Sequence, residues 1–387
     1  MTITSFLVYA LAEVEKCAFA ADVFAENSEK WLADETVETG HKKTIVSHLP
    51  LGVILGIMPW NFPFWQAMRF AIPALTAGNT AILRHSNVCP ISALAIEEAF
   101  RLSGYPEQVF QTVISEHDAV SSLIKGKGLI DGVSLTGSVE AGRRVGALAG
   151  RNLKKLVLEL GGSDPFIVLE DADLQLTCKG ACSGRTLNSG QSCICSKRFI
   201  AVKEIADEFT KGLIDNMRMQ KIGDPMAEAT EIGPLANQQQ LETLERQVKE
   251  SVAMGARIAA GGKRAKVNGK GFFYEPTVLV DVRPGMPAAK EELFGPVAPV
   301  IVAKSEKEAI KIANSSTLGL AGSIWTADIK KGERIARQLQ SGMAAVNGVF
   351  RSDPRIPFGG VKESGVGREL SRYGILEFAN TKSITID

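Results

Sequence analysis

The sequence predicts an α/β fold in which helices cover mainly parallel sheets. The first indication is the uninterrupted apolar run Leu51–Met58, which ends at Pro59 and is typical of a parallel strand buried on both faces. The second is the alternation of strand-like and helix-like segments, which is the pattern of a doubly wound sheet. The third is that this alternation starts again after Glu159. We therefore expect two α/β regions.

The elements follow in order from the spacing of apolar residues. Before residue 35 the spacing predicts one or two helices, and residues 35–48 alternate like an exposed strand or hairpin arm. Further strands are expected at residues 80–83, 109–113 and 133–136, and helices at residues 67–77, 92–102, 119–124 and from 139. In the second region, strands are expected at residues 165–169, 199–202 and 299–302, and helices near residues 174–185, 204–219 and 238–254. Residues 263–270 indicate a solvated basic loop, and residues 381–386 an edge strand.

The composition is that of a globular protein with no preference for nucleic acid. Of the 387 residues, 45% are hydrophobic and 22% are charged, and 44 basic residues balance 43 acidic ones without a long basic run. The apolar segment 3–12 is too short to span a bilayer and lacks a basic flank. Six irregularly spaced cysteines fit a reducing compartment. We expect a cytoplasmic protein that binds neither nucleic acid nor membranes.

A polar, glycine-containing segment, Asn188–Cys193, precedes the β-prone residues 198–202. This order predicts a loop that presents Cys193 ahead of a strand, where reactive groups often lie. A nucleophilic thiol needs a base, and Glu159 is the nearest carboxylate in a motif-like setting, at the end of an apolar run and before two glycines. The alternatives are a buried, inert Cys193 and a salt-bridged Glu159 at a strand end.

The Glu-Leu-Gly-Gly and Gly-Gln-x-Cys motifs at this spacing resemble those of the aldehyde dehydrogenase superfamily. Four further stretches continue the resemblance in family order: Pro59-Trp60-Asn61-Phe62-Pro63, Leu135–Gly142, Glu291–Val297 and Phe358–Gly365. The resemblance runs from about residue 50 to the C-terminus. The sequences of the motifs are most similar to those of the shorter bacterial branch of succinate-semialdehyde dehydrogenases.

The resemblance implies a Rossmann-type cofactor domain, an α/β catalytic domain and a small oligomerisation arm. The expected divisions are residues 1–34 with 49–160 for the cofactor domain, 161–375 for the catalytic domain, and 35–48 with 376–387 for the arm. In the family, the C-terminal tail pairs with the arm that precedes Leu49 and with a neighbouring subunit, so a homodimer or homotetramer is expected. Relative to the family the chain begins late, and the first part of the cofactor domain has no counterpart here.

The resemblance also assigns catalytic roles. Cys193 adds to the aldehyde, and Glu159 takes the thiol proton and later activates water on the thioester. The side-chain amide of Asn61, together with the backbone N–H of Cys193, holds the oxyanion. A plain turn residue is the alternative for Asn61.

The cofactor implied is NAD or NADP, although no Gly-x-Gly-x-x-Gly fingerprint follows a strand. The family uses Gly137 and Ser138 at a strand-to-helix turn, where helix N-terminal amides meet the pyrophosphate. Glu292 matches the residue that holds the nicotinamide ribose. The remaining candidates for cofactor contact are Pro59, Trp60, Arg84, Asn87 and Phe294.

Two positions at the adenosine ribose depart from the family pattern. Arg84 replaces a lysine, and Asn87 replaces a glutamate. Loss of that carboxylate removes the clamp that selects NAD and the repulsion of a 2′-phosphate, while Arg84 can pair with the phosphate. The sequence therefore predicts that NADP is accepted.

The substrate is expected to be a small aldehyde that carries a distal carboxylate. Arg69 stands where succinate-semialdehyde dehydrogenases carry arginine, and a guanidinium that faces an apolar tunnel selects such an aldehyde. A surface arginine is the alternative. A second arginine of many of those enzymes is Leu187 here, and Arg185 and Arg355 are the nearest substitutes.

The expected activity is therefore NAD(P)-dependent oxidation of succinate semialdehyde to succinate. The alternatives are a broad-specificity dehydrogenase for aliphatic or aromatic aldehydes, and a catalytically inactive truncated member. A cysteine hydrolase or acyltransferase would need a histidine partner, and the four histidines lie outside the catalytic motifs. The pairs Cys178/Cys182 and Cys193/Cys195 have spacings atypical of zinc sites, so no metal is expected.

Overall fold

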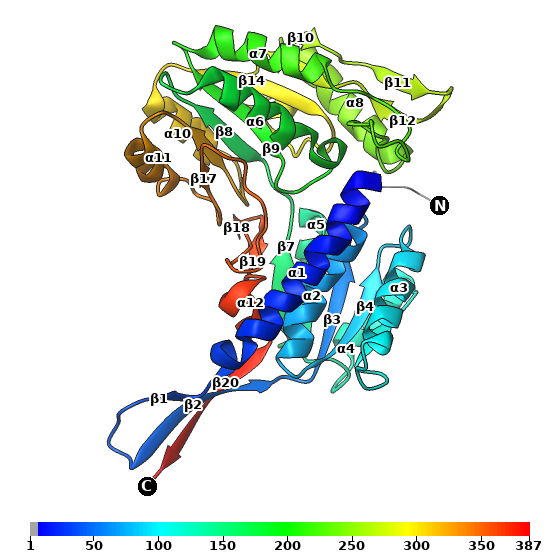
Figure 1. Cartoon of the computed structure of the whole chain (residues 1–387), viewed down its shortest axis with the longest axis vertical. Helices are drawn as coiled ribbons and strands as arrows, with labels where there is room; N and C mark the ends of the chain where they lie inside the picture. The colour runs from blue at the N-terminus through cyan, green and yellow to red at the C-terminus, as the bar shows by residue number, and fades with distance from the viewer. Residues whose placement is uncertain (1–6) are drawn as a thin grey trace. The chain divides into compact units, whose positions relative to one another are not determined.

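The computed structural model describes residues 7–387, and Figure 1 shows the path of the chain. Residues 1–6, which the expected first helix and cofactor domain include, lie outside the described residues. The chain divides into two compact units. The N-terminal unit contains Leu11–Leu160, Ser352–Gly359 and Gly365–Asp387; the central unit contains Gly161–Arg351, Gly360–Ser364 and, of the described residues, 7–10.

The N-terminal unit is built on a six-stranded sheet of order β19-β7-β6-β3-β4-β5. Its strands are β3 (Val53–Met58), β4 (Thr80–His85), β5 (Phe110–Thr112), β6 (Gly132–Thr136), β7 (Lys155–Glu159) and β19 (Gly365–Val366). All neighbours run parallel except β19, which is antiparallel to β7. The chain leaves β3 toward β4 but leaves β6 toward β7, so the order reverses between β3 and β6. Such a switch point opens a crevice at the carboxyl ends of the two strands.

Helices cover both faces of this sheet, because successive strand residues point to opposite sides. Ile54 packs in one cluster with Phe70 of α2 and Ile96 of α3, whereas its neighbour Leu55 packs in another with Ile124 of α4. The helices of the unit are α1 (Leu7–Leu32), α2 (Pro63–Thr76), α3 (Pro90–Leu102), α4 (His117–Lys125), α5 (Val139–Arg151) and α12 (Ser371–Glu377). Among the described residues before 35, a single helix, α1, is thus present.

A three-stranded antiparallel arm extends from the N-terminal unit (Figure 1). Its strands are β1 (Glu35–Thr36), β2 (Lys43–Pro50) and β20 (Ala379–Ile386). The tail pairs with β2 along its whole length, from Lys43 opposite Ile386 to Pro50 opposite Ala379. The pairing expected between these two segments is therefore present within one chain.

The central unit contains a seven-stranded sheet of order β10-β13-β14-β9-β8-β16-β17, in which only β10 is antiparallel to its neighbour. Its strands are β8 (Asp164–Val168), β9 (Ser196–Val202), β10 (Arg257–Ala260), β13 (Thr277–Val280), β14 (Val297–Ala303), β16 (Ser323–Trp325) and β17 (Ala345–Val346). Its helices are α6 (Leu174–Thr186), α7 (Ala206–Arg218), α8 (Gln238–Ala253), α9 (Pro287–Lys290), α10 (Glu306–Asn314) and α11 (Ile329–Ala336). Stacked rings of Phe166 and Trp325, 5.0 Å apart, lie in its core.

Two smaller ladders complete this unit. Strands β15 (Leu318–Gly319) and β18 (Val361–Lys362) pair antiparallel. The expected basic loop at residues 263–270 is instead part of a hairpin of β11 (Arg264–Val267) and β12 (Lys270–Tyr274). The interpretation as a loop was wrong because Phe273 and Tyr274 are buried and hold the second strand against the unit, whereas the basic residues face outward.

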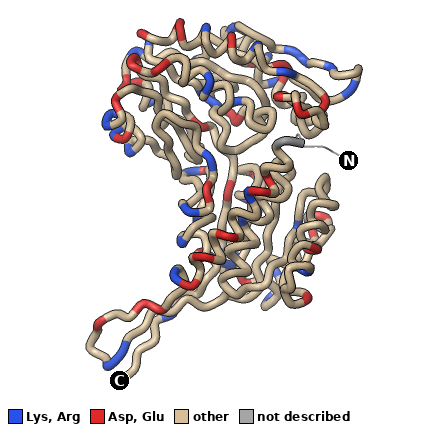
Figure 2. The backbone as a smooth tube through the Cα atoms, viewed as in Figure 1, with Lys and Arg blue, Asp and Glu red and all other residues tan. Residues whose placement is uncertain are grey.

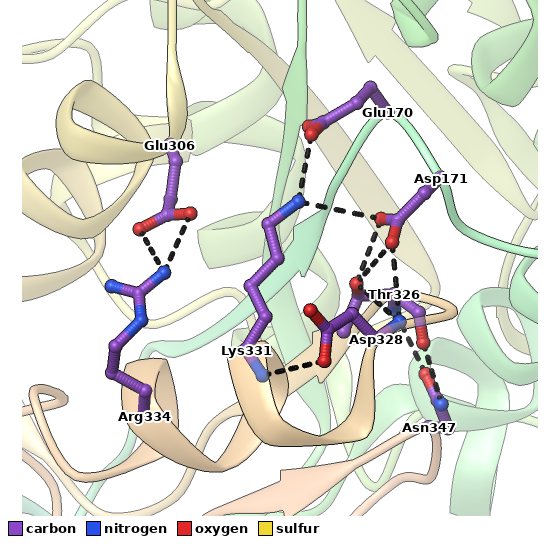
Figure 3. Close-up of polar contacts among 8 residues, drawn as sticks. All are labelled: Glu170, Asp171, Glu306, Thr326, Asp328, Lys331, Arg334 and Asn347. Carbon is purple, nitrogen blue, oxygen red and sulfur yellow. Dashed lines mark hydrogen bonds and ion pairs between the residues drawn. The ribbon is translucent and has the colours of Figure 1, made fainter.

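Helix α11 is anchored at its N-terminus by a polar network (Figure 3). Asp328 caps the helix by accepting the backbone N–H of Lys331. Asp171, which follows β8, accepts the hydroxyl of Thr326 at 2.8 Å and the N–H of Asp328 at 3.2 Å. Asn347 makes two bonds to the main chain of Thr326. This network joins the ends of three neighbouring strands to one helix.

The division into units differs in part from the expected domains. It falls between residues 160 and 161, where the cofactor and catalytic domains were expected to meet. However, residues 352–359 and 365–375, expected in the catalytic domain, pack with the N-terminal unit. The reason is that Gly365 and Val366 extend the N-terminal sheet beside β7, and Phe358 pairs with Glu369 through the main chain.

Acidic and basic residues are interspersed over the described part of the chain, as Figure 2 shows. Within residues 7–387 no helix is long and apolar enough to cross a membrane.

Candidate active site

In the central unit, Cys193 lies on a tightly turned loop between α6 and β9. The turn begins with a short 3₁₀ segment, Leu187–Gly190, and three consecutive residues, Asn188, Ser189 and Gly190, have positive φ values of 50°, 56° and 78°. This backbone is uncommon for residues other than glycine and persists only where surrounding contacts hold it. At Gly190 a side chain would collide with the main chain of Gly295, so this position requires glycine.

Segment 233–236 holds this loop through side-chain to main-chain hydrogen bonds. Gln191 accepts the N–H of Ala236 at 2.8 Å and donates to the carbonyls of Asn188 and Pro234. Ser189 both donates to and accepts from the main chain of Gly233. Because each of these side chains is buried, the loop is rigid where it presents Cys193.

Arg185 supports the same loop from the last turn of α6. Its guanidinium is fully buried and donates to the carbonyl of Gly190 at 2.8 Å. Burial lowers the pKa of Arg185, with partial compensation from nearby Cys195 and Glu292. This placement favours a structural support over the expected contact with substrate.

Cys193 is the exception among the six cysteines, all of which are free thiols in the described residues. It is partly exposed, whereas the other five are buried. Burial raises the pKa of Cys178 to about 11 and that of Cys182 to about 12, so these two thiols are inert at neutral pH. No group of three potential metal ligands occurs among the described residues.

The Gly161–Gly162 pair brings three segments of the central unit together. Glu292 accepts the N–H of Gly162 at 3.1 Å, and its carboxylate also lies 3.2 Å from the ammonium of Lys197. A side chain at Gly161 would collide with the carboxylate of Glu292, and one at Gly162 with the carbonyl oxygen of Cys193. Glycine is thus required at position 162, whereas a side chain at position 161 would displace the flexible carboxylate of Glu292.

Two charged residues near Cys193 were missed in the sequence. Lys197, at the start of β9, is buried and donates to the carbonyls of Ser192 and Cys193. Asp164 is fully buried; burial raises its pKa to about 7, although Lys197 and a hydrogen bond from Ala321 lower it. The available signal was the presence of three charged residues, Asp164, Lys197 and Arg198, next to or within strand-like stretches.

In the N-terminal unit, Asn61 is buried in the short turn between β3 and α2. Directly after this turn, Glu13 of α1 caps the start of α2, because its carboxylate accepts the N–H groups of Phe64 and Trp65, each at 2.7 Å. Burial raises the pKa of Glu13 to about 7, and the two backbone hydrogen bonds oppose that rise. A carboxylate at this position also interacts favourably with the helix dipole. Sequence reasoning missed Glu13.

Glu159 lies at the end of β7 and is almost completely buried. Burial raises its pKa well above the usual range, the charge of Glu369 raises it further, and Arg69 and Arg368 lower it. Neither carboxyl oxygen has a hydrogen-bond partner among the described residues. An unsolvated carboxyl of this kind can accept a proton at near-neutral pH, which suits a general base.

Arg69, on the second turn of α2, forms a buried ion pair with Glu369. Its guanidinium carbon lies 4.3 Å from the ring centre of Phe358, and its side chain is only 2% exposed. The surface alternative for Arg69 is therefore wrong. The positive charge of Arg69 is balanced by Glu369. Glu369, which follows the Gly-Val-Gly-Arg stretch, was missed in the sequence analysis.

The carboxyl ends of β3, β4 and β6 carry the expected cofactor residues. Pro59 and Trp60 follow β3, and Ser138 follows β6 as the N-cap of α5, where its hydroxyl accepts the N–H of Ala141. Gly137 bonds to the carbonyl of Glu159. The N-terminus of α5 follows the carboxyl end of β6, at the switch point of the sheet, which is a favourable place for a phosphate.

Arg84 and Asn87 lie together at the end of β4. Arg84 donates to the side-chain oxygen of Asn87 at 2.8 Å and to the carbonyl of Ser115, while the buried hydroxyl of Ser115 has no partner among the described residues. Burial lowers the pKa of Arg84, and Glu116 opposes this. A guanidinium, an amide and an unpaired hydroxyl are donors that fit a phosphate, so these residues fit a nucleotide.

Arg355 lies apart from these groups. It is exposed, forms an ion pair with Asp353 at 2.6 Å and stacks near Phe19. The structure thus brings together Glu159, Arg69 and Glu369 in the N-terminal unit, and Cys193, Lys197 and Glu292 in the central unit.

Comparisons with known proteins agree with the motifs. The model of the aldehyde dehydrogenase family matches residues 4–384. A probable succinate-semialdehyde dehydrogenase (NADP(+)) of Synechocystis is 46% identical over 377 residues, which are 97% of this chain and 82% of the relative. Succinate-semialdehyde dehydrogenase (NADP(+)) 1 of Mycobacterium tuberculosis is 44% identical over 383 residues, which are 98% and 83% of the two chains.

Among solved structures, succinic semialdehyde dehydrogenase from Streptococcus pyogenes, in complex with NADP+, superposes with a TM-score of 0.96. It is 36% identical, and the match covers 100% of this chain and 84% of that one.

Proposed function

The chain belongs to the aldehyde dehydrogenase family, and from this premise we propose that it oxidises succinate semialdehyde to succinate with NADP as the hydride acceptor. The observation that carries the chemistry is the partial exposure of Cys193, alone among six free thiols, on a loop held rigid by buried side chains. The named relatives, at 44–46% identity, support the choice of substrate and cofactor.

In the proposed reaction, the thiolate of Cys193 adds to the carbonyl carbon, forming a C–S bond and an oxyanion. The side-chain amide of Asn61 and the backbone N–H of Cys193 stabilise that oxyanion. Bound NADP would supply the acceptor for the hydride of this carbon, and loss of that hydride would leave a thioester on Cys193. Water then adds to the thioester, and the acid leaves as the C–S bond breaks.

Glu159 is proposed as the base in both half-reactions. It takes the thiol proton first, releases that proton to solvent, and then takes the proton of the attacking water. Its raised pKa supports this role, because a carboxylate of ordinary pKa is a weak base at neutral pH.

The residues proposed to hold the nucleotide lie at four places. The α5 N-terminus, with Gly137 and Ser138, would hold the pyrophosphate. Arg84, with Asn87, would hold the 2′-phosphate of NADP. Pro59 and Trp60 are proposed beside the crevice at the end of β3. Glu292 and Phe294 are proposed at the nicotinamide ribose.

Arg69 is proposed to bind the distal carboxylate of the substrate. Burial raises the pKa of Glu369, so a proton on Glu369 would leave the positive charge of Arg69 to a bound carboxylate. The ion pair with Glu369 also favours a second candidate function, a broader aldehyde dehydrogenase, because a fully satisfied Arg69 would give no preference for charged aldehydes.

We further infer a cytoplasmic homodimer or homotetramer. Six free cysteines support a reducing compartment, and β1 and β20 are the edge strands of the arm sheet, which another subunit can extend.

The proposal is tested by following NADPH formation with succinate semialdehyde, hexanal and benzaldehyde in parallel. A kcat/KM highest for succinate semialdehyde supports the proposal. Equal values for all three support the broader dehydrogenase, and no reduction with any of them contradicts both.

A further inference from the structure

We propose that Lys197 is a positioning residue that ties the carboxylate of Glu292 to the main chain of Cys193, so that nucleotide binding at Glu292 alters the reactivity of the thiol. The inference rests on the proposed function, because it takes Cys193 as the nucleophile and Glu292 as the ribose ligand. It adds a residue that none of the motifs singled out.

The ammonium group of Lys197 contacts three acceptors. It donates to the carbonyl oxygens of Ser192 at 2.9 Å and Cys193 at 2.6 Å, and it lies 3.2 Å from Glu292 Oε1. An ammonium has three N–H donors, and here it makes two hydrogen bonds and one ion pair. The side chain is only 1% exposed, and a buried charge is tolerated only with such compensation.

The carbonyl groups of Ser192 and Cys193 belong to the two peptide planes on either side of the Cys193 side chain, so they set its orientation. A trans peptide is planar, so the carbonyl of Ser192 and the N–H of Cys193 lie in one plane and point in opposite directions. By holding this carbonyl, Lys197 sets the direction of the Cys193 N–H, the proposed oxyanion donor. By holding the carbonyl of Cys193 as well, it fixes the next peptide plane. The backbone on both sides of the thiol is therefore tied to one ammonium.

Glu292 connects this arrangement to the cofactor. Its Oε1 contacts Lys197 and the N–H of Gly162, yet the side chain is 25% exposed and can turn away. A carboxylate that turns to the hydroxyls of a ribose gives up its contact with Lys197. Lys197 then loses one of three acceptors while the two carbonyls of the Cys193 loop remain. Binding at Glu292 is thus transmitted to the two peptide planes of the nucleophile.

The experiment measures thiol reactivity instead of turnover. The rate constant for alkylation of Cys193 by iodoacetamide is determined without and with saturating NADP, and NADP binding is followed separately by protein fluorescence. Lys197→Met keeps the length of the side chain without its donors. Lys362→Met is the matched control, because Lys362 in the same unit donates to two carbonyls, of Asn314 and Ser316, each at 2.9 Å.

We expect NADP to change the alkylation rate of the unmodified protein and of Lys362→Met several-fold. In Lys197→Met, we expect this change to vanish while NADP affinity stays within about threefold, and kcat to fall about 10- to 100-fold from misplacement of the nucleophile. An unaltered NADP effect in Lys197→Met overturns the inference, as does the lack of an effect in the unmodified protein that binds NADP.

A second variant tests the inference if Lys197→Met fails to fold. Glu292→Gln leaves Lys197 with its two carbonyls and removes only the charged link, so saturating NADP must change the alkylation rate less than in the unmodified protein. An unchanged effect again overturns the inference. Failure of the proposed function is distinct: NADP reduction is then absent with every aldehyde, whatever the alkylation rates show.

Discussion

Arg69 and Glu369 form a buried ion pair beside the carboxyl group of Glu159. The pair joins α2 to the segment that precedes α12, within the N-terminal unit. Glu369 raises the pKa of Glu159 and Arg69 lowers it, so the protonation of the proposed base depends on both. Because these three ionisable groups are buried together, replacing any one of them should change the pKa values of the others strongly.

Replacing Glu369 by glutamine removes a negative charge near Glu159 and leaves Arg69 without its partner. The pKa of Glu159 should fall, so the rise of kcat with pH should move to lower pH. Stability should drop by about 3–5 kcal/mol, the usual cost of breaking a buried pair. A pH–rate profile and urea unfolding measure the two effects, and an unmoved acid limb contradicts the electrostatic account.

Replacing Arg69 by alanine should reduce kcat/KM for succinate semialdehyde about 10- to 100-fold more than for hexanal. The physical reason is the loss of a charged hydrogen bond to the distal carboxylate, worth about 1.5–3 kcal/mol. Arg372→Ala, which breaks an exposed pair with Glu35, is the control. The double variant Arg69→Met/Glu369→Gln separates specificity from instability. Equal losses for both aldehydes would show that Arg69 does not read the carboxylate.

Glu13→Gln should remove a pH dependence of stability. The pKa of Glu13 is about 7 in the folded chain, against an ordinary value of 4.5. The folded state therefore holds the proton more tightly, and stability is highest below about pH 4.5 and declines as the pH rises to about 7. The decline is on the order of 3 kcal/mol. Unfolding free energies of both proteins at pH 5 and 8 measure it; parallel changes with pH would contradict this role.

Much of the fold, and the loop that presents Cys193, could be predicted from the sequence, because local patterns specify them. The apolar run Leu51–Met58 forms a central strand, and the α/β class is confirmed by the sheets and the solved relatives. The partners Glu13, Lys197 and Glu369 could not be predicted. Glu13 and Glu369 contact segments that are distant in the sequence, and Lys197 turns back on its own loop. Spacing along one sequence does not show such contacts.

The substrate arginines illustrate the same limit. A guanidinium can be listed from the sequence, but its burial and its partner cannot. Arg185 proves to support the Gly190 turn, and Arg355 is paired with Asp353 at the surface. Only Arg69 lies beside the proposed base, and its partner Glu369 comes from the far end of the chain.

Asn87→Glu should shift the cofactor preference from NADP toward NAD. The new carboxylate would lie where Asn87 now accepts from Arg84, so it would neutralise that guanidinium and repel a 2′-phosphate. We expect the ratio of kcat/KM for NADP over NAD to fall roughly 10- to 100-fold, equivalent to about 1.4–2.7 kcal/mol. Asn87→Gln, which keeps the amide, is the matched control. A ratio that does not change would place the 2′-phosphate elsewhere.

The most direct test of the central claim is NADPH formation from succinate semialdehyde by the unmodified protein, Cys193→Ala and Cys195→Ala. Cys195 is the neighbouring buried thiol, so it controls for effects of the loop itself. We predict rapid NADPH formation by the unmodified protein and Cys195→Ala, and a loss of about a thousandfold or more in Cys193→Ala. Comparable rates in Cys193→Ala, or no reduction of NADP by the folded unmodified protein, would contradict the assignment of Cys193 as the nucleophile of an aldehyde dehydrogenase.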